Sequence, residues 1–456
     1  MMYSPIKEDL PNSLATVINE TLQDPIGDLQ LSGRTILKGG TVIDPKNRIE
    51  EIKDISILHG RIHQVESDII PEKGDKVIYC EGLLVVPGLI DMHLHLGDLF
   101  DVSSAPIFEA VQDGVTMGLS PGAGNSFMTP ALVGAEMDRG LPLNIGVFLG
   151  APNVLGTMLD VEELILLFQG KLDQEIAERK MTRNMLTYKT APLIVGLKDH
   201  MGHYLMPDEN FDKIFEITSR AKLIFMSHTQ CPSHANRVLE LSKGRPVHLA
   251  HATAAGCGSH ADPVEGMKEV IELCKRDNVS AEFVTTMLRE GLGSREGLMM
   301  TKQSQQLAFD ALSSGVVDVL ISDGQNAATM KGFGDTRDNI PALIELAEQG
   351  VLTLSDSIAT MTSNVSRLIA EKTNNQWWTE EVGHLGVGAL ANVTIIDKAD
   401  KMATYTIVNG ELVSFENRAI RRGNGAGGWV SKFGMVKRVG VGDLTTHSYE
   451  KPAVRS

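Results

Sequence analysis

The feature that most constrains the fold is an alternation of short apolar segments with segments of helical periodicity, which runs through residues 86–371. The apolar segments are the one ending in Asp91-Met92-His93-Leu94-His95, then 116–120, 143–149, 193–197, 223–227, 247–250, 280–285 and 317–322. Between the sixth and seventh, Asp262 is expected to cap a helix that Pro263 begins. Eight strand–helix units predict an α/β protein with a (β/α)8 TIM barrel, whose chemistry lies at the C-terminal ends of its strands.

Short β-like segments punctuated by Gly, Asp, Pro and Asn lie on both sides of this region, in residues 33–85 and 383–415. We expect them to form one small β-sandwich domain built from both ends of the chain. Residues 1–32 then make an N-terminal extension and residues 416–456 a C-terminal tail.

The composition excludes several classes of partner. The formal net charge of −16 argues against a nucleic-acid partner, because binding to a phosphate backbone requires clustered Lys and Arg. The four cysteines have no C-x-x-C spacing, which is typical of reduced thiols in a cytoplasmic protein. No apolar run approaches the ~20 residues of a membrane span, and residues 1–18 lack the apolar core of a signal peptide. The sequence therefore predicts a cytoplasmic protein with a small-molecule partner, without membrane or nucleic acid.

His93 and His95 end the first barrel strand. Alternate residues of a strand point to the same side, so the two imidazoles are expected to project together while Met92 and Leu94 pack on the other face. Two imidazoles on one side of a rigid strand are typical of metal ligands. The alternative is a pair of half-buried structural histidines.

Polar residues also end four other predicted strands. Lys198 follows the fourth, His228 ends the fifth, His251 the sixth and Asp323 the eighth. Because these ends meet at one edge of a barrel, the six side chains are expected to converge. His248 is three residues from His251, so it is expected on the other side of the strand, in the barrel wall.

This pattern resembles the amidohydrolase superfamily, and the Gly-Leu-Lys setting of Lys198 is similar to that of its dihydroorotase-like and hydantoinase-like members. The resemblance implies two divalent metal ions, with Zn²⁺ first and Mn²⁺, Fe²⁺ or Co²⁺ also suited to imidazole ligands. The implied ligands are His93, His95, Lys198, His228, His251 and Asp323. Lys198 would act as a carbamate formed with carbon dioxide, because an ammonium cannot bind a cation. The alternative for Lys198 is a salt bridge to Asp199 or Asp323.

Side chains that select the substrate are expected in the loops after the strands. The candidates are His200 and His203 after Lys198, Arg289 after the seventh strand, and Asn125 in the Gly-rich loop after the second. Arg289 has the fork geometry that binds a carboxylate. A structural salt bridge to Glu290 or Glu282 is the alternative for this guanidinium.

The resemblance implies a metal-dependent hydrolase that cleaves a non-peptide C–N bond. Cyclic amides and imides come first, followed by small N-acyl compounds, with esters and lactones left open. A metal-bridging hydroxide would attack, and Asp323 would serve as general base and then general acid. The alternatives are a deaminase of an amino-heterocycle, which Lys198 disfavours, and a catalytically silent scaffold or assembly homologue. A homo-oligomer is expected from the same resemblance.

Overall fold

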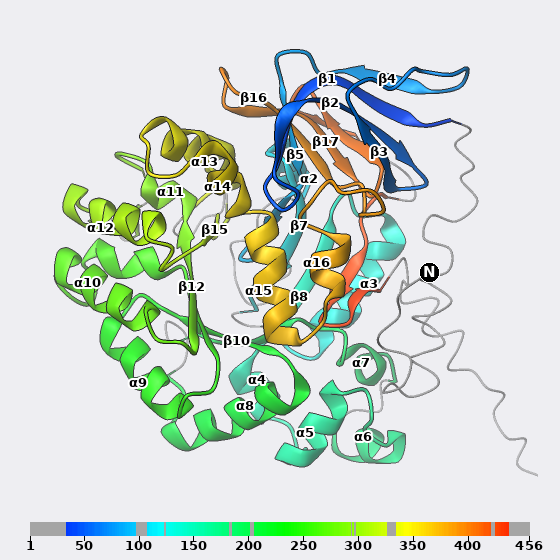
Figure 1. Ribbon diagram of the computed structural model, residues 1–456. Helices are drawn as coiled ribbons and strands as arrows, with labels where there is room; N and C mark the ends of the chain where they lie inside the picture. Colours follow the sequence, from blue (N-terminus) through cyan, green and yellow to red (C-terminus); the bar gives the residue numbers. More distant parts are fainter. Residues whose placement is uncertain are drawn as a thin grey trace, which may run out of the picture.

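The computed structural model describes residues 33–96, 107–122, 125–181, 185–200, 205–292, 294–295, 298–325, 334–420 and 425–436. These residues form a barrel surrounded by helices and a second sheet that adjoins it (Figure 1). No helix in the described part of the chain is long and apolar enough to cross a bilayer.

The barrel is built from parallel strands whose order in space is their order along the chain. They are β6 (Leu89–Asp91), β7 (Val115–Ser120), β8 (Asn144–Gly150), β9 (Gly196–Asp199), β10 (Ile224–His228), β11 (Val247–Ala250), β12 (Val279–Val284) and β15 (Val319–Ile321). A bridge between Leu94 and Gly324 closes the last strand onto the first. The predicted TIM barrel is confirmed.

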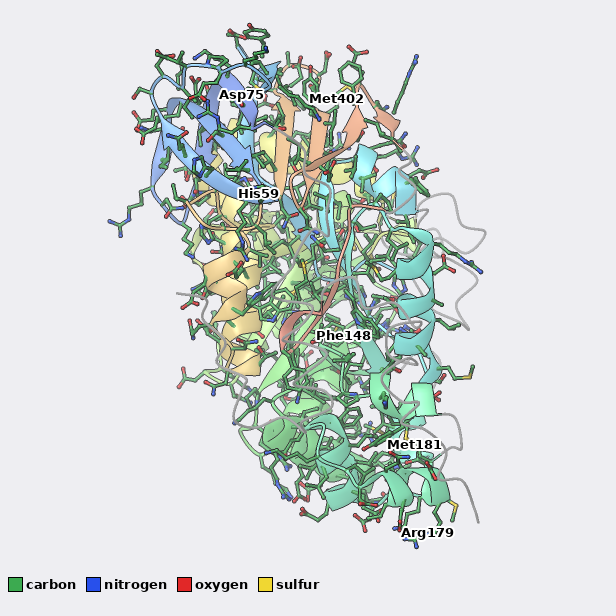
Figure 2. The ribbon with its side chains drawn as sticks, turned by 90° about the vertical axis from the view of Figure 1, so that its right-hand side faces the viewer. His59, Asp75, Phe148, Arg179, Met181 and Met402 are labelled. Atoms are coloured by element: carbon green, nitrogen blue, oxygen red, sulfur yellow. The ribbon has the colours of Figure 1, made fainter. Side chains whose placement is uncertain are left out.

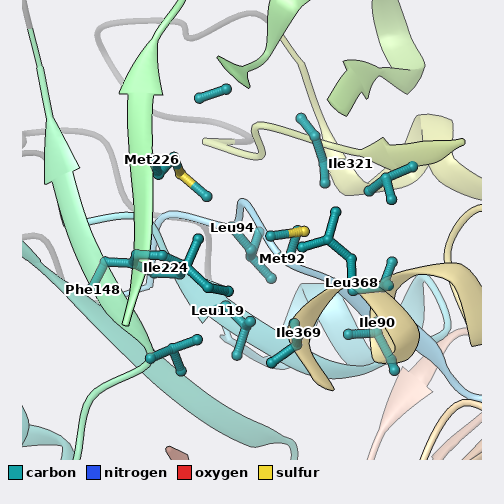
Figure 3. Packing of buried hydrophobic residues seen from close by; sticks show 14 of the residues in the cluster. Ile90, Met92, Leu94, Leu119, Phe148, Ile224, Met226, Ile321, Leu368 and Ile369 are labelled. Carbon is teal, nitrogen blue, oxygen red and sulfur yellow. The ribbon is translucent and has the colours of Figure 1, made fainter. Parts of the chain in front are cut away.

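The barrel strands are apolar runs because both of their faces are buried. Met92, Leu94 and Ile321 pack in the interior, where Leu119 and Met226 join them (Figure 3). The amphipathic helices cover the outside of the barrel. These are α2 (Ile107–Gln112), α3 (Met128–Arg139), α8 (Asp208–Ala221), α9 (Pro232–Ser242), α10 (Pro263–Cys274), α12 (Lys302–Ser313) and α13 (Asn339–Glu348).

Helix α10 begins as the sequence predicts. The Asp262 carboxylate accepts hydrogen bonds from the backbone N–H groups of Val264 and Glu265, at 3.0 and 3.1 Å, and Pro263 is its first residue. Capping of this kind satisfies N–H groups that have no partner within the helix.

Further helices extend the basic repeat. Between β8 and β9 lie α4 (Ala151–Leu155), α5 (Val161–Phe168), α6 (Gln174–Lys180) and α7 (Met185–Thr190). The remaining segments are the 3₁₀ helices Ala252–Cys257 and Thr336–Asp338, the short hairpin β13 (Ser294–Arg295) and β14 (Leu298–Met299), and helices α11 (Thr285–Leu288), α14 (Leu354–Ala359), α15 (Ser363–Thr373) and α16 (Trp377–Glu381).

The second sheet combines strands from both ends of the chain, as predicted. Its order is β19 (Arg418–Ala419), β18 (Glu411–Phe415), β17 (Met402–Val408), β16 (Val393–Asp397), β5 (Leu84–Pro87), β1 (Thr35–Asp44), β2 (Ile49–Leu58) and β3 (Arg61–Glu66), with β4 (Lys76–Tyr79) beside β1. β5 and β16 join the two ends antiparallel. A separate core that includes Leu37, Ile55 and Ile395 stabilises this sheet. In Figure 2, Asp75, just before β4, and Met402 of β17 lie at one end of the molecule, and Arg179 and Met181 of the α6 region lie at the other.

Part of the predicted C-terminal tail belongs to the barrel. Residues of the hairpin β20 (Trp429–Ser431) and β21 (Gly434–Val436) lie between β8 and the segment that leads into β9. The indole N–H of Trp429 donates to the carbonyl of Leu193 at 3.2 Å, and the backbone N–H of Lys432 donates to that of Ile194 at 2.9 Å. Trp429 is fully buried, so the hairpin contributes to the core of the barrel.

Three buried asparagines connect the barrel, the second sheet and this hairpin. Asn409 donates from Nδ2 to Oδ1 of Asn144 at 2.8 Å, and its backbone N–H donates to Oδ1 of Asn392 at 2.9 Å. Oδ1 of Asn144 also accepts from the backbone N–H of Gly428 at 2.8 Å. Asn144 is the first residue of β8, so this asparagine cluster lies at the N-terminal end of the barrel.

Candidate metal centre

The pair His93 and His95 lies just beyond the first barrel strand, which ends at Asp91. The expectation that both histidines sit on the strand therefore needs correction: a bend follows Asp91, and only Leu94 bridges to a neighbour. The buried Asp91 carboxylate holds this bend, because its Oδ1 accepts from the backbone N–H of His93 and of Ser322, each at 3.2 Å. The ends of the first and eighth strands are thereby fixed to each other.

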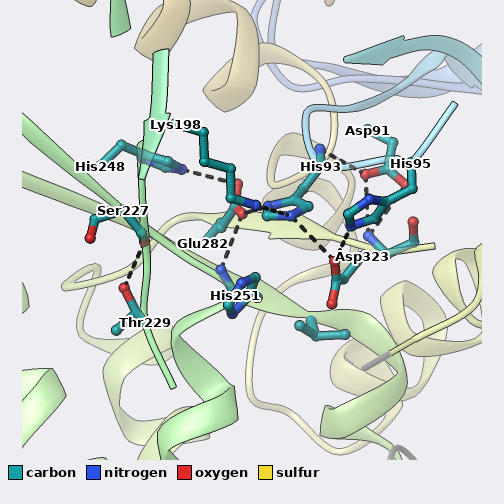
Figure 4. Close-up of polar contacts among 12 residues, drawn as sticks. Asp91, His93, His95, Lys198, Ser227, Thr229, His248, His251, Glu282 and Asp323 are labelled. Carbon is teal, nitrogen blue, oxygen red and sulfur yellow. Dashed lines mark hydrogen bonds and ion pairs between the residues drawn. The ribbon is translucent and has the colours of Figure 1, made fainter. Parts of the chain in front are cut away.

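His93, His95 and Asp323 form the central group of the site (Figure 4). Oδ1 of Asp323 is 3.0 Å from Nε2 of His95 and 3.2 Å from Nε2 of His93. One ligand atom from each residue lies within 4.8 Å of the others, and all three residues are buried. Asp323 has φ of 50°, a left-handed conformation that costs free energy in a non-glycine residue and is common at functional sites.

The pKa shifts of His93 and Asp323 favour the protonation states that bind a cation. Burial alone would raise the pKa of Asp323, but His93, His95 and Lys198 outweigh it and bring that pKa down to about 2. Burial and the charge of Lys198 lower the pKa of His93. Neutral imidazoles and an ionised carboxylate are the forms that bind divalent metals.

Lys198 is buried at the end of β9, where Nζ lies 2.8 Å from Nε2 of His93. The strand can approach its neighbours closely because residue 196 is glycine: a Cβ there would lie 2.3 Å from the carbonyl oxygen of Ile224. Asp199, the alternative partner of Lys198, instead contacts His234 at 2.8 Å and Ser227 at 3.2 Å. The structure therefore brings the Lys198 amine to the two-histidine group.

His251 and His228 complete the set of predicted ligands. The ring of His251 lies 5.1 Å from that of His93 and 4.4 Å from that of His228, measured between centroids. His251 has a left-handed backbone with φ of 37°. Burial, followed by the charges of His228 and His93, lowers its pKa well below the usual value. The six predicted ligand residues thus lie in one buried region at the C-terminal end of the barrel.

The predicted substrate-selecting residues have different surroundings. The ring of His200 lies 4.6 Å from that of His228, at the edge of the group. Asn125 is buried and donates from Nδ2 to the carbonyl of Phe148 at 3.1 Å. The guanidinium of Arg289 pairs with Asp338 and with Glu345, rather than with Glu290 or Glu282. His203 lies outside the described residues.

Glu282 is a buried residue of this region that sequence analysis assigned only as a possible partner of Arg289. It lies in β12, contacts Nδ1 of His93 and is 3.0 Å from Nε2 of His248. The two histidines outweigh burial and lower the pKa of its carboxyl. A carboxylate inside an apolar strand was the available signal, because such a group requires partners.

Comparison with known proteins places this site in a family. The family model described as "Amidohydrolase family" matches residues 84–413, which include the eight parallel barrel strands and part of the second sheet. The chain belongs to the amidohydrolase family. A dihydroorotase from Aquifex aeolicus is 22% identical over 408 residues, covering 80% of this chain and 89% of the relative.

Solved structures of the amidohydrolase fold agree with the architecture of this chain. A D-hydantoinase structure matches with a TM-score of 0.64 at 15% identity and covers 88% of this amidohydrolase and all of that chain. A dihydropyrimidinase from Brevibacillus agri NCHU1002 matches with a TM-score of 0.62 at 17% identity, over 87% and 98% of the two chains. These likenesses establish the barrel with its second sheet.

The residues present in this amidohydrolase fit a divalent cation. The donors are imidazole nitrogens and a carboxylate oxygen, which suit zinc and its neighbours in the first transition series. Their mutual proximity and complete burial give an ion several ligands at once.

Proposed function

We propose that this amidohydrolase hydrolyses the C–N bond of a cyclic amide or imide at a site for two divalent ions. The observation that carries the proposal is the meeting of His93, His95 and Asp323 within 4.8 Å, with Lys198 beside His93. The names dihydroorotase, hydantoinase and dihydropyrimidinase all denote enzymes of rings that contain an amide bond. Small N-acyl compounds form the next class of substrate.

We assign six residues to the metal centre: His93, His95, Lys198, His228, His251 and Asp323. Zn²⁺ is the first candidate, and carbon dioxide would convert the Lys198 amine into an anionic carbamate. When bound, a pair of such ions makes water a nucleophile near neutral pH and polarises the substrate carbonyl. The barrel strands hold the six side chains in place, and all six are buried.

Asp323 is the residue that we assign to proton transfer. It is the carboxylate of the central group, and its Oδ1 faces Nε2 of both His93 and His95. As an anion it can take a proton from the attacking water and then donate it to the leaving nitrogen. General acid–base catalysis of this kind contributes ~10²–10⁴ in rate.

We assign His200, Asn125 and His203 to substrate binding. Within the described residues, Oδ1 of Asn125 is a buried acceptor with no hydrogen-bond partner, so it can accept an N–H of a ring. Arg289 is left out of this set because Asp338 and Glu345 occupy its guanidinium. The panel of candidate substrates therefore includes neutral rings, such as hydantoins and dihydropyrimidines, as well as rings that carry a carboxylate.

The deciding experiment measures metal content and ring opening with wild-type protein and Lys198→Ala. With bicarbonate supplied, we expect two ions per subunit in the wild-type protein. In Lys198→Ala we expect both the bound metal and the ring-opening activity to be lost. Lys302→Ala, which changes a surface lysine, is the control and should behave as wild type. A metal-free wild-type protein would identify a scaffold homologue and end the proposal.

Two further measurements test the rival deaminase activity and the oligomeric state. Ammonia release from amino-heterocycles, with one ion per subunit and no effect of Lys198→Ala, would identify a deaminase instead. Light scattering tests the expected homo-oligomer. The four cysteines are all free thiols, which supports the expected reducing, cytoplasmic compartment.

A further inference from the structure

Glu282 and His248 form a buried pair directly behind the proposed metal centre. Glu282 is fully buried in the middle of β12, and His248 is 1% exposed on the neighbouring strand β11. Neither residue belongs to the proposed ligand set. A carboxylate and an imidazole in such a position cost free energy unless their hydrogen bonds are satisfied, so their contacts indicate their role.

The carboxylate of Glu282 contacts two of the proposed ligands at once (Figure 4). Its Oε1 faces Nδ1 of His93 and also accepts from the backbone N–H of His251 at 3.1 Å. Its Oε2 lies 3.0 Å from Nε2 of His248, whose Nδ1 is 3.0 Å from Oγ of Ser280. Both oxygens of the carboxylate are therefore fixed in direction.

These contacts determine which nitrogen of His93 faces the centre. A carboxylate oxygen accepts hydrogen bonds, so the proton of the neutral His93 ring resides on Nδ1. Nε2 then keeps its lone pair and points toward Lys198 and Asp323, as a metal ligand must. The same oxygen holds the backbone of His251 in its left-handed conformation.

We propose that Glu282, aligned by His248, is the positioning residue that orients His93 and His251 for the ions, and this inference rests on the proposed function. His248 donates to Glu282 and prevents the carboxylate from rotating away from His93. His248 in β11 and His251 just after that strand thus have separate tasks, one acting through Glu282 and the other directly on a metal.

Glu282→Gln is the first test, because glutamine keeps the shape of the side chain and removes its charge and one acceptor. We expect the affinity for Zn²⁺ or Co²⁺, measured by competition with a chromophoric chelator, to fall ~10–100-fold. The visible spectrum of the Co²⁺-loaded protein should change as well, because the ligand geometry is altered.

A pair of variants at His248 tests the alignment separately. His248→Leu removes the donor to Glu282 and should weaken ion binding. His248→Gln retains an N–H donor and should restore most of the affinity. If Glu282→Gln does not fold, the comparison of the two His248 variants still tests the inference.

His234→Leu is the matched control, because His234 is a second buried histidine paired with a carboxylate, Asp199, at 2.8 Å. We expect this variant to lose thermal stability as His248→Leu does, yet to keep the affinity for the ions and the Co²⁺ spectrum. Equal ion affinity in wild type, Glu282→Gln and His248→Leu would overturn the inference while leaving the proposed function intact. A wild-type protein that binds no ion would end both.

Discussion

The barrel carries a buried polar centre at each end, and the two centres are built from different chemistry. At the C-terminal ends of the strands, His93, His95 and Asp323 are ionisable groups, and burial and neighbouring charges shift the pKa values of His93 and Asp323. At the N-terminal end, Asn144 and Asn409 are neutral amides that satisfy each other's hydrogen bonds. The first centre brings together ligand atoms for an ion, whereas the second joins three parts of the same chain.

The comparison teaches that burial of polar groups alone does not identify a functional site. Both centres are buried, and both connect residues that are far apart in the sequence. They differ in whether the lone pairs of several acceptor atoms point to one position, where an ion can bind. Only the first centre gives a substitution that should abolish chemistry and leave the fold intact.

The largest expected effect is at Asp323. Asp323→Asn should lower the rate of ring opening by ~10²–10⁴, because the amide cannot take up the proton. The far-ultraviolet circular dichroism spectrum should not change.

Asp318→Asn is the control for this change, since Asp318 is an exposed carboxylate just before the same strand, paired with Arg367. Its activity should equal that of wild type. Full activity in Asp323→Asn would remove this residue from the proton-transfer step.

A smaller effect, on stability rather than chemistry, is expected at Asn144. Asn144→Ala leaves the backbone N–H of Gly428 without its acceptor and removes one of the two acceptors of Nδ2 of Asn409, whose other acceptor is the carbonyl of Ala426. Urea unfolding should show a loss of about 1–3 kcal/mol for the stranded N–H of Gly428, with the metal content of the folded protein unchanged. A fall in metal content would mean that the two ends of the barrel are coupled.

A pH-dependent effect on the free energy of unfolding is expected from Lys432. Burial lowers the pKa of this lysine from 10.5 to about 7 in the folded protein, so between these values the unfolded chain binds the extra proton. Lys432 should therefore make the free energy of unfolding rise with pH over this window, by at most ~1.4 kcal/mol per pH unit.

Lys432→Met should remove this contribution, which urea unfolding from pH 7 to 9 measures as the difference between the two proteins. Parallel curves would show that the buried ammonium is stabilised by the carbonyl of Ala221, which it contacts.

Much of the fold follows from local patterns in the sequence. The apolar runs that became β10 and β15 and the capped start of α10 can be recognised without any partner. The positions of Lys198 and Asp323 at strand ends follow from the apolar runs that precede them. In these cases the residues that decide the structure are neighbours along the chain.

The remaining features depend on contacts between distant residues. Glu282 contacts His93 across 189 positions, and Gly428 bonds Asn144 across 284. The partners of Arg289, Asp338 and Glu345, lie about fifty positions beyond the arginine and on a different element. No periodicity or local motif specifies such pairs, because they arise only when the barrel closes.

The hairpin of Trp429–Ser431 and Gly434–Val436 has a consequence for the synthesis of the protein. Because it packs between β8 and the approach to β9, the barrel lacks part of its core until residue 436 has been made. A nascent chain that has already exposed all eight barrel strands outside the ribosome still cannot complete its tertiary packing. Chains truncated before Trp429 should therefore require chaperones for longer than the full-length protein does.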